Sequence, residues 1–423
     1  MKLTVVGGGS TYTPELIDGF ARMRDVLPIE ELWLVDTDPE RLRLVGGMSE
    51  RMFRAAGHTG RIVPTDDLVA GVSDADAVLI QLRVGGQAAR HGDETFPHEC
   101  GCIGQETTGP GGFAKALRTV PVVLRVADAV RAHAKPDAWI VDFTNPVGIV
   151  TRALLQEGHR AVGLCNVAIG FQRRFASLLG VDHTAITLGH VGLNHLTWER
   201  AAYVTDAEGT HDALPAIIES RLAELAEEIE LPAPLITMLG SVPSYYLRYY
   251  YAHDEVLREQ LDSPTRAEAV QEVERALLEL YADPRVDTKP EALAKRGGAF
   301  YSEAAVDLIA SLRSDRGDTQ VVNLRNSGSL PFLPDDHVIE VPAIVGSSGV
   351  TALPVEPLPD DLRGLISHVA GYERLALDAA VHGGRERVVR AMLAHPLVGQ
   401  YDRAERLTDL LLANNRQHLA WAR

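Results

Sequence analysis

The feature that most constrains the fold is a regular alternation of apolar runs and helical patterns in the first half of the chain. Short apolar runs at 2–6, 32–35, 77–82, 139–143 and 161–164 have the length and composition of buried strands. Helical patterns lie between them, one beginning near Pro14 and one over 39–56. This alternation predicts βαβ units and a Rossmann-like, doubly wound parallel sheet of the α/β class.

The second half of the chain has a different pattern. Long amphipathic helices are predicted over 213–229 and 266–281, and a third within 386–412. Between them, 320–324 and 338–341 have the pattern of strands. We therefore expect two domains, residues 1–190 and residues 191–423, the second being a mixed α/β domain. With no low-complexity linker between them, a site is expected in the crevice where they pack.

Composition and charge narrow the class of partner. The 423 residues carry a formal net charge of -17, which argues against nucleic acid or an anionic membrane surface as the partner. No apolar run approaches the ~20 residues of a membrane helix, and no signal peptide is predicted ahead of the first strand. The three cysteines, Cys100, Cys102 and Cys165, are an odd and sparse set. We expect a cytoplasmic protein without disulfides.

A glycine turn follows the first predicted strand and has the features of a dinucleotide site. Gly7, Gly8 and Gly9 let the backbone approach a pyrophosphate, with Ser10 and Thr11 leading into the next helix. The match to G-x-G-x-x-G is partial, since Tyr12 stands where the third glycine is usual. Asp36 closes the second strand, where a carboxylate binds the ribose hydroxyls and favours NAD over NADP. The alternative is a glycine-rich turn that binds no ligand.

Two further segments are candidates for lining a site. Asn145 follows the strand at 139–143, at the carboxyl edge of the sheet; it could contact a ligand, or it could cap the next helix. The loop over 101–112 is dense in glycine, which indicates close backbone approach to something nearby.

Cysteine, histidine and tyrosine supply the remaining candidates. Cys165 and His195 are of the residue types that bind a borderline divalent metal, although their spacing alone favours packed core residues. The tyrosine-rich segment at 245–251 could be an aromatic helix face or could contain a general base. These alternatives stay open from the residues alone.

Taken together, these segments resemble glycoside hydrolase family 4, the NAD- and metal-dependent glycosidases. The matching stretches stand in the family's order from Met1 to about Pro342: MKLTVVGGGSTYTPELIDGF, RVGGQAARHGDE, GCIGQETTGPGGFAKALRTVP, FTNPVG, GLCNVAIG, GLNHLTW and YLRYYY. The resemblance implies a fold similar to that of lactate and malate dehydrogenases. It also implies NAD and a divalent metal, usually Mn²⁺, as cofactors.

The resemblance assigns a role to each matching residue. Cys165 and His195 match the metal ligands, and Tyr246 matches the catalytic base. Four positions match residues that contact the substrate: Asn145 beside the metal, Asn166 after the metal cysteine, and Arg90 and Arg266 at the sugar phosphate.

The residue after the metal cysteine sorts the family by substrate. Asparagine at this position, Asn166 here, accompanies the 6-phospho-β-glucosidases. Ala168 is a departure, because many relatives have proline there, and it puts fine substrate preference in doubt. The resemblance therefore implies an enzyme acting on a phosphorylated glycoside. We also expect it to be cytoplasmic and to form a homodimer or homotetramer.

The mechanism that the resemblance implies begins with oxidation at C3 of the sugar. The C2 proton then becomes acidic, Tyr246 removes it, the C1 substituent leaves, water adds, and C3 is reduced again. NAD-dependent glycosidases are exceptions to the two-carboxylate rule. Two alternatives remain: an NAD-dependent dehydrogenase of a hydroxy acid or sugar, and a catalytically silent NAD-binding sensor.

Overall fold

A single sheet runs through both halves of the protein. The computed structural model describes residues 1–207, 209–298 and 300–422, and within them it forms a 13-stranded sheet. Six parallel strands lie in the order β3-β2-β1-β4-β5-β6, which is the order of a dinucleotide-binding sheet. Their bounds are β1 Lys2–Val6, β2 Glu31–Val35, β3 Arg61–Thr65, β4 Ala77–Ile80, β5 Trp139–Asp142 and β6 Ala161–Gly163. The predicted doubly wound parallel sheet is confirmed.

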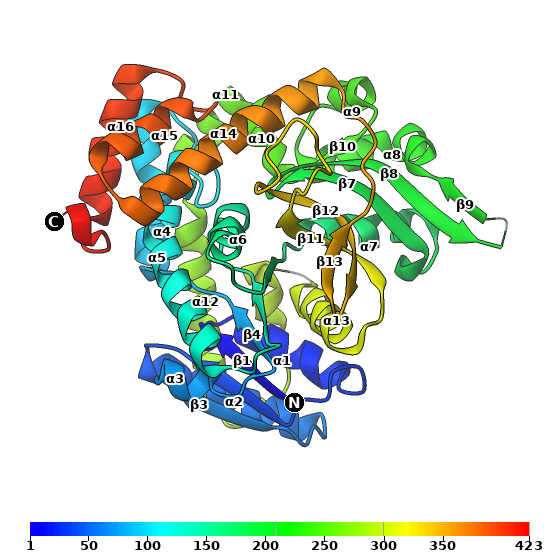
Figure 1. Ribbon diagram of the computed structural model, residues 1–423, viewed down its shortest axis with the longest axis vertical. Helices are drawn as coiled ribbons and strands as arrows, with labels where there is room; N and C mark the ends of the chain where they lie inside the picture. The colour runs from blue at the N-terminus through cyan, green and yellow to red at the C-terminus, as the bar shows by residue number, and fades with distance from the viewer. Residues whose placement is uncertain (208, 299, 423) are drawn as a thin grey trace.

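The first helices of this half begin at residues that favour a helix N-terminus. Helix α1 has Pro14 in its first turn, and α2 is capped by Asp38, whose carboxylate accepts hydrogen bonds from two backbone N–H groups. Long α5, buried along much of its length, packs against α6 and α14 (Figure 1). The bounds are α1 Thr13–Arg22, α2 Pro39–Ala55, α3 Leu68–Val72, α4 Gly86–Thr95, α5 Gly109–His133, α6 Val147–Gln156 and α7 Val167–Leu179.

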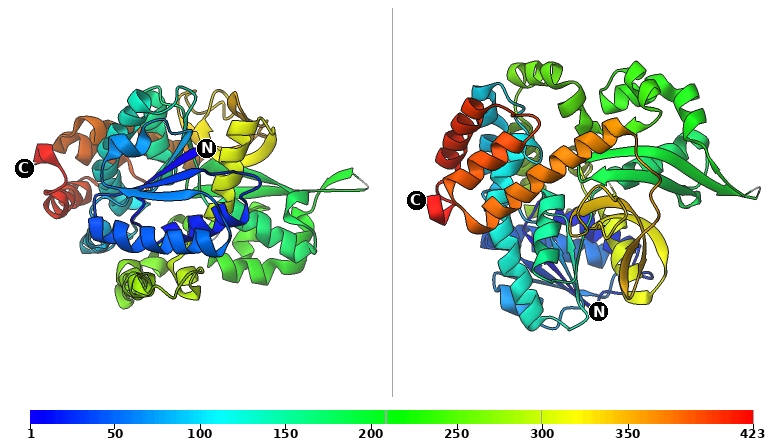
Figure 2. Two further views of the ribbon diagram at one scale, coloured as in Figure 1. Left: turned by 90° about the horizontal axis from the view of Figure 1, so that it is seen from below. Right: turned by 45° about the horizontal axis from the view of Figure 1, so that its top comes forward.

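Antiparallel strands extend the sheet beyond β6. They follow in the order β11-β12-β7-β8-β10, with β9 pairing β8 and β13 pairing β12. The hairpin of β8 and β9 projects from the body of the molecule, as Figure 2 shows. The bounds are β7 Ile186–Leu193, β8 Leu196–Asp206, β9 Gly209–Asp212, β10 Val242–Pro243, β11 Asp318–Arg325, β12 Val338–Gly346 and β13 Gly349–Ala352.

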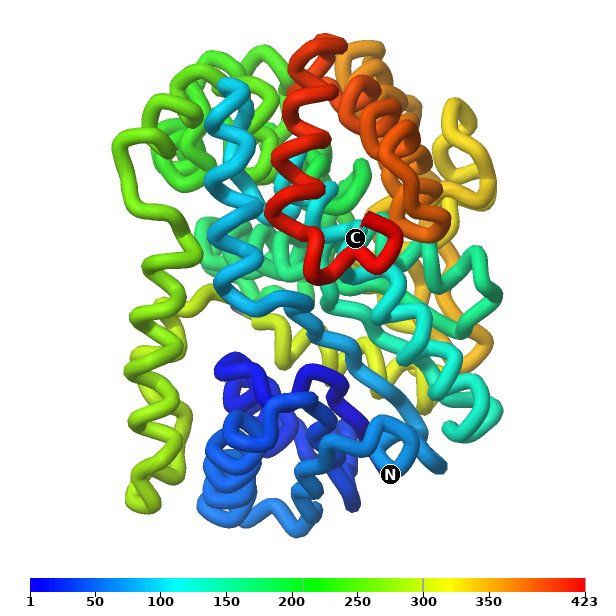
Figure 3. The backbone as a smooth tube through the Cα atoms, turned by 90° about the vertical axis from the view of Figure 1, so that its left-hand side faces the viewer, coloured from blue at the N-terminus to red at the C-terminus, as the bar shows by residue number. Residues whose placement is uncertain are grey.

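Several helices of the second half pack on helices of the first half. Helix α12 lies beside α2 and α4, and α16 lies beside α4 and α5 (Figure 3). The bounds are α8 Leu214–Ile229, α9 Ala233–Leu239, α10 Arg248–Tyr251, α11 His253–Asp262, α12 Arg266–Ala282, α13 Tyr301–Ser314, α14 Asp360–His382, α15 Arg385–Ala394 and α16 Tyr401–Asn415. The mixed α/β character expected for this half is confirmed, and the division at 190/191 stays a prediction.

Two details differ from the sequence expectations. The segment 386–412, expected to contain one helix, falls within α15 and α16, which a turn at 395–400 separates. The long strands β7 and β8 were not predicted; their hairpin carries the turn with Asn194 and His195. Among the described residues, no helix is long and apolar enough to span a membrane.

Candidate active site

The glycine turn between β1 and α1 is held close to the neighbouring strands. Gly7 has a φ of 91°, and a Cβ atom there would lie 2.5 Å from the carbonyl oxygen of Gln81. The backbone N–H of Gly9 donates to the Asp36 carboxylate across 2.9 Å. A carboxylate has about four acceptor positions, so Asp36 keeps capacity for ribose hydroxyls. The turn therefore has the geometry expected of a dinucleotide site.

Thr11 has a different environment from the rest of this turn. Its side chain is fully buried, and its hydroxyl bonds Glu274 at 3.1 Å and Arg296 at 2.8 Å. Glu274 also pairs with Arg41, so helix α12 is bound to the turn by a buried ionic network. Any contact of Thr11 with a cofactor would therefore be through its backbone. Ser10, by contrast, is only half-buried and its Oγ accepts from the N–H of Tyr12.

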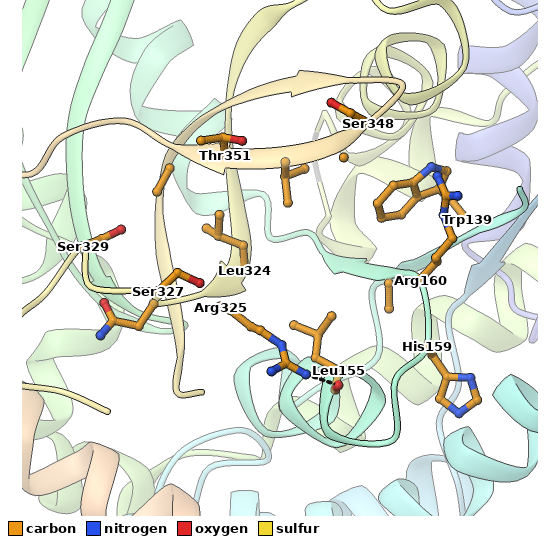
Figure 4. A pocket seen from close by; sticks show the side chains of 15 residues that line it. Trp139, Leu155, His159, Arg160, Leu324, Arg325, Ser327, Ser329, Ser348 and Thr351 are labelled. Carbon is orange, nitrogen blue, oxygen red and sulfur yellow. Dashed lines mark hydrogen bonds between the residues drawn. The ribbon is translucent and has the colours of Figure 1, made fainter. Parts of the chain in front are cut away.

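A cavity of about 460 Å³ lies where the loop after α4 meets the tyrosine segment. We call it the tyrosine pocket; its walls come from residues 90–107, Asn145 and residues 245–266. Four predicted site residues line it: Arg90, Asn145, Tyr246 and Arg266. Another cavity, of about 520 Å³, opens beside Trp139 and Arg325 (Figure 4), and none of the predicted site residues lines it.

The arginine end of the tyrosine pocket is a dense charge cluster. Arg90 pairs with Glu94 at 2.7 Å and with Glu106 at 3.2 Å, and Arg83 and Lys115 also contact Glu106. Burial alone would raise the pKa of Glu106, but these three cations hold it well below its usual range. Three cations thus face two carboxylates, which leaves the cluster with an excess of positive charge suited to an anionic substrate.

Arg266 reaches this pocket as the first residue of helix α12. Thr265 caps that helix in a capping box with Glu268, and Glu94 accepts a hydrogen bond from the backbone N–H of Ala267 at 2.8 Å. Arg266 is exposed, and its guanidinium donates to the carbonyl of Lys295. It therefore lies at the mouth of the pocket, whereas Arg90 lies within it.

His195 is fixed in one tautomer by the loop that follows α4. The hydroxyl of Thr107 donates to Gln105 at 2.8 Å, so at 2.9 Å from His195 Nδ1 it can only accept. The proton of His195 therefore sits on Nδ1, and Nε2 keeps its lone pair. Burial lowers the pKa of His195 to about 4, so the ring is neutral at physiological pH. A neutral imidazole with a free Nε2 is the form that binds a metal.

Cys165 is buried at the end of β6 and has polar neighbours. The side chains of Asn194 and Tyr301 lie beside its sulfur and act to lower the pKa of the thiol. Burial, with Glu340 adding to the effect, raises the pKa of the thiol to about 12. The thiolate that a metal requires would need a compensating cation, and a divalent ion supplies one.

The residues present fit a divalent metal with two protein ligands. The Oδ1 atom of Asn145 is buried without a hydrogen-bond partner among the described residues, and it lines the tyrosine pocket that His195 adjoins. A buried acceptor left unpaired calls for a ligand or ion to satisfy it. No cluster of three or more His, Cys, Asp or Glu side chains suited to a metal occurs in the described residues. Substrate oxygens would thus complete the coordination, as in a catalytic metal site.

Tyr246 stacks on His195 and lies near Cys165. Burial raises its pKa well above 10, and the strongest neighbouring groups, Cys165, Tyr249, Glu106 and Tyr245, raise it further. A phenolate at this position therefore requires a nearby cation, as the expected role of Tyr246 as a base implies.

Several residues of the site were not identified from the sequence. Tyr301 and Glu340 come from the second half and reach Cys165 and its neighbours only through the fold. Glu106 and Lys115 stand in the glycine-dense loop and the helix after it, which the sequence marked without assigning a role. The glycines of that loop are explained by close backbone packing: a Cβ on Gly104 would lie 1.9 Å from the carbonyl oxygen of Glu94.

The fold and the site together define an α/β enzyme of the dinucleotide-binding class. The model for "Family 4 glycosyl hydrolase" matches residues 2–181, and that for the "Family 4 glycosyl hydrolase C-terminal domain" matches residues 190–398. The chain belongs to glycosyl hydrolase family 4, and the resemblance drawn from the motifs is confirmed.

Relatives and solved structures agree with this membership. The chain is 40% identical to a probable 6-phospho-β-glucosidase of Bacillus subtilis, over 99% of this chain and 97% of the relative. It is 34% identical to the 6-phospho-β-glucosidase of Escherichia coli, over 98% and 96%. The 6-phospho-β-glucosidase structure of Thermotoga maritima with NAD and glucose-6-phosphate matches with a TM-score of 0.92 and 34% identity, over 99% of each chain.

More distant structures share the fold alone. Malate dehydrogenase from Salinibacter ruber is 16% identical with a TM-score of 0.50, over 89% of this chain and 97% of that one. The expected similarity to malate dehydrogenase is therefore confirmed at the level of the fold.

Proposed function

We propose that this enzyme hydrolyses 6-phospho-β-glucosides with NAD and a divalent metal, Mn²⁺ first among them, as cofactors. The relatives named above carry that activity in their names, and a T. maritima structure contains manganese, NAD⁺ and glucose-6-phosphate. Asn166 after Cys165 supports the β-glucoside specificity, as the family resemblance implies.

One observation carries the proposal. Arg90, Arg266, Asn145 and Tyr246 come from four separate segments and line the same tyrosine pocket. A plain dehydrogenase of a hydroxy acid needs a hydride acceptor and a general base, but it needs no tyrosine packed on a metal-binding imidazole. A pocket with arginines at one end and a base beside a metal site fits a phosphorylated sugar.

Each residue then has a distinct task. Bound NAD would supply hydride transfer at C3, and a bound divalent ion would supply Lewis acidity next to C2. Cys165 and His195 would hold the ion, and the glycine turn with Asp36 would hold NAD. Arg90 and Arg266 bind the sugar phosphate through charge-assisted hydrogen bonds, which fixes the ring over Tyr246.

Tyr246 performs the proton transfer. Its phenolate oxygen takes the proton from C2, after which the C1 substituent leaves, and the phenol returns a proton to C2 once water has added at C1. Asn145 and Asn166 contact the substrate hydroxyls beside the metal ligands.

The assembly and location are part of the same proposal. The three cysteines are all free, which accords with a reducing cytoplasm. We expect a homodimer or homotetramer, which light scattering on the purified protein would measure. The net charge of -17 supports a small-molecule substrate in preference to nucleic acid or a membrane.

A screen of nitrophenyl glycosides tests the proposal. Purified enzyme with NAD and Mn²⁺ is given β- and α-glucosides, each with and without a 6-phosphate. Release of nitrophenol from the phosphorylated β-glucoside, without net NADH, is the expected result. Net NADH accumulation would identify a dehydrogenase instead, and neither signal would identify an NAD-binding protein without catalysis.

A further inference from the structure

Behind the proposed metal ligands lies a buried carboxylate that the reaction itself does not use. Glu340, on β12, is almost completely buried, with a side chain only 1% exposed. Its two oxygens accept three hydrogen bonds, from His190 Nε2 at 3.0 Å and from Asn194 and Asn323 Nδ2 at 2.8 Å each. Burying a carboxylate costs free energy unless it is paired and hydrogen-bonded, and these three donors hold Glu340 in one position.

Asn194 connects this carboxylate to the metal site. Its amide nitrogen donates to Glu340 at 2.8 Å, and the same side chain lies beside the sulfur of Cys165. A thiolate can only accept, and the NH₂ group is the only donor of an asparagine side chain, so the group suited to face a thiolate is the one that Glu340 holds. Glu340 therefore fixes the orientation of the amide beside Cys165.

The same short turn carries the second ligand. Asn194 and His195 are consecutive in the hairpin between β7 and β8, where Leu193 pairs with Leu196. His195 has a φ of 62°, a conformation that few non-glycine residues adopt. Fixing the Asn194 side chain against β12 thus also fixes the turn from which His195 projects.

We propose that Glu340 and Asn194 are positioning residues for the Cys165–His195 metal site, an inference that rests on the proposed function of that pair. The Glu340–Asn194 bridge orients the cysteine sulfur and the histidine turn before the ion arrives, and its negative charge favours a cation there. Replacing a residue that hydrogen-bonds a metal ligand typically lowers metal affinity by about 10- to 100-fold.

The structure supplies a matched control for this bridge. Glu199 on β8 bonds His190 Nδ1 at 2.5 Å and has a side chain that is also 1% exposed. Like Glu340, it is buried and bonds His190. Replacing either glutamate by glutamine therefore removes a buried charge next to the same histidine. Its bond is to the opposite ring nitrogen, so Glu199 lies outside the bridge to Cys165.

Metal titration of the purified, NAD-loaded enzyme tests the inference. Mn²⁺ affinity is measured by calorimetry without substrate, and Co²⁺ replaces it to record the thiolate-to-cobalt absorption band. Glu340→Gln and Asn194→Ala should each lose about 10- to 100-fold in Mn²⁺ affinity and should shift or weaken that band. Glu199→Gln should keep the affinity and the band of the wild type, whatever its thermal stability.

The outcomes separate this inference from the proposed function. Wild-type affinity in Glu340→Gln, or an equal loss in Glu199→Gln, would overturn the positioning role while leaving the metal site intact. Wild-type enzyme that binds no Mn²⁺ would overturn the metal site itself. Asn194→Ala leaves Glu340 in place, so it decides the question even where Glu340→Gln does not fold.

Discussion

The imidazole of His195 lies flat on the phenol ring of Tyr246, with ring centroids 3.6 Å apart and planes 7° from parallel. The proposed base and a proposed metal ligand are therefore in direct contact, and each restricts the position of the other. Positive charge bound at His195 would oppose the effect of burial, which raises the pKa of Tyr246. This contact is also why the tyrosine ring must be kept in any test of its hydroxyl.

Tyr246→Phe removes the hydroxyl and keeps the ring against His195. We expect NAD and Mn²⁺ affinities to stay at wild-type values, because the stacked contact is preserved. The turnover number should fall at least about a hundredfold, in line with the usual contribution of a general base. Steady-state kinetics with a phosphorylated nitrophenyl glucoside, alongside both binding constants, make the measurement.

Solvent isotope incorporation checks the same step independently. In D₂O the wild-type enzyme should place deuterium at C2 of the released sugar, because Tyr246 returns a solvent-exchanged proton. Tyr245→Phe is the matched control, since its hydroxyl accepts a hydrogen bond from Arg248 in the same pocket. Product without deuterium at C2 would exclude proton abstraction from C2 altogether.

Metal binding should depend on pH through Cys165 alone. The pKa of this thiol is raised to about 12 and that of His195 is lowered to about 4, so near neutrality the thiol is protonated and the imidazole is not. Binding Mn²⁺ must displace the thiol proton, so affinity should rise about tenfold per pH unit between pH 6 and 8, an order-of-magnitude estimate for one released proton. Calorimetry in buffers of different ionisation enthalpy counts the proton directly.

Cys102→Ser serves as the control for that titration, because Cys102 is buried elsewhere and lies outside the site. It should release one proton per metal, as the wild type does. Affinity that is constant with pH would mean that Cys165 is not a ligand.

The sequence can predict those parts of the site whose residues lie close together in the chain. The turn at Gly7 and Asp36 lies within one βαβ unit, where strand, turn and carboxylate follow in a fixed order, so pattern alone predicts it as a dinucleotide site. Cys165 follows β6 and His195 follows β7, strands that are not adjacent in the sheet, and their spacing alone favours packed residues. The family resemblance, and not periodicity, singled them out.

Glu340 could not be found from the sequence for a related reason. Its strand reads as an ordinary buried segment, and its importance comes from three donors on other elements. The β7–β8 hairpin that carries Asn194 was also missed, because its residues are buried on both faces and do not alternate cleanly. Tertiary contacts, and not local pattern, created this part of the site.

Asp36→Ala should weaken NAD binding and relax the discrimination against NADP. The carboxylate is a ribose-binding acceptor in the proposal, and it also accepts the N–H of Gly9. We expect roughly tenfold weaker NAD binding, the effect of losing about 1.4 kcal/mol, with NADP affinity unchanged or higher. Fluorescence titration of both cofactors measures this, with Glu40→Gln on the exposed start of α2 as the control. Tighter wild-type binding of NADP than of NAD would contradict the role of Asp36.

Arg266→Ala tests the phosphate site at the mouth of the tyrosine pocket. Its guanidinium donates to the carbonyl of Lys295, which holds it in place while leaving other N–H groups to face a phosphate dianion. Losing one charge-assisted contact to a dianion should lower kcat/KM about 10- to 100-fold for the 6-phospho-β-glucoside, corresponding to about 1.5–3 kcal/mol. The same change should leave the slow hydrolysis of the plain β-glucoside nearly unaffected.

The control variant is Arg275→Ala, which removes the same charge from an exposed position on the same helix, away from the pocket. It should affect neither substrate. An equal loss on both glucosides in Arg266→Ala would mean that this arginine supports the pocket without binding the phosphate, and Arg90 would then be the arginine left to bind it.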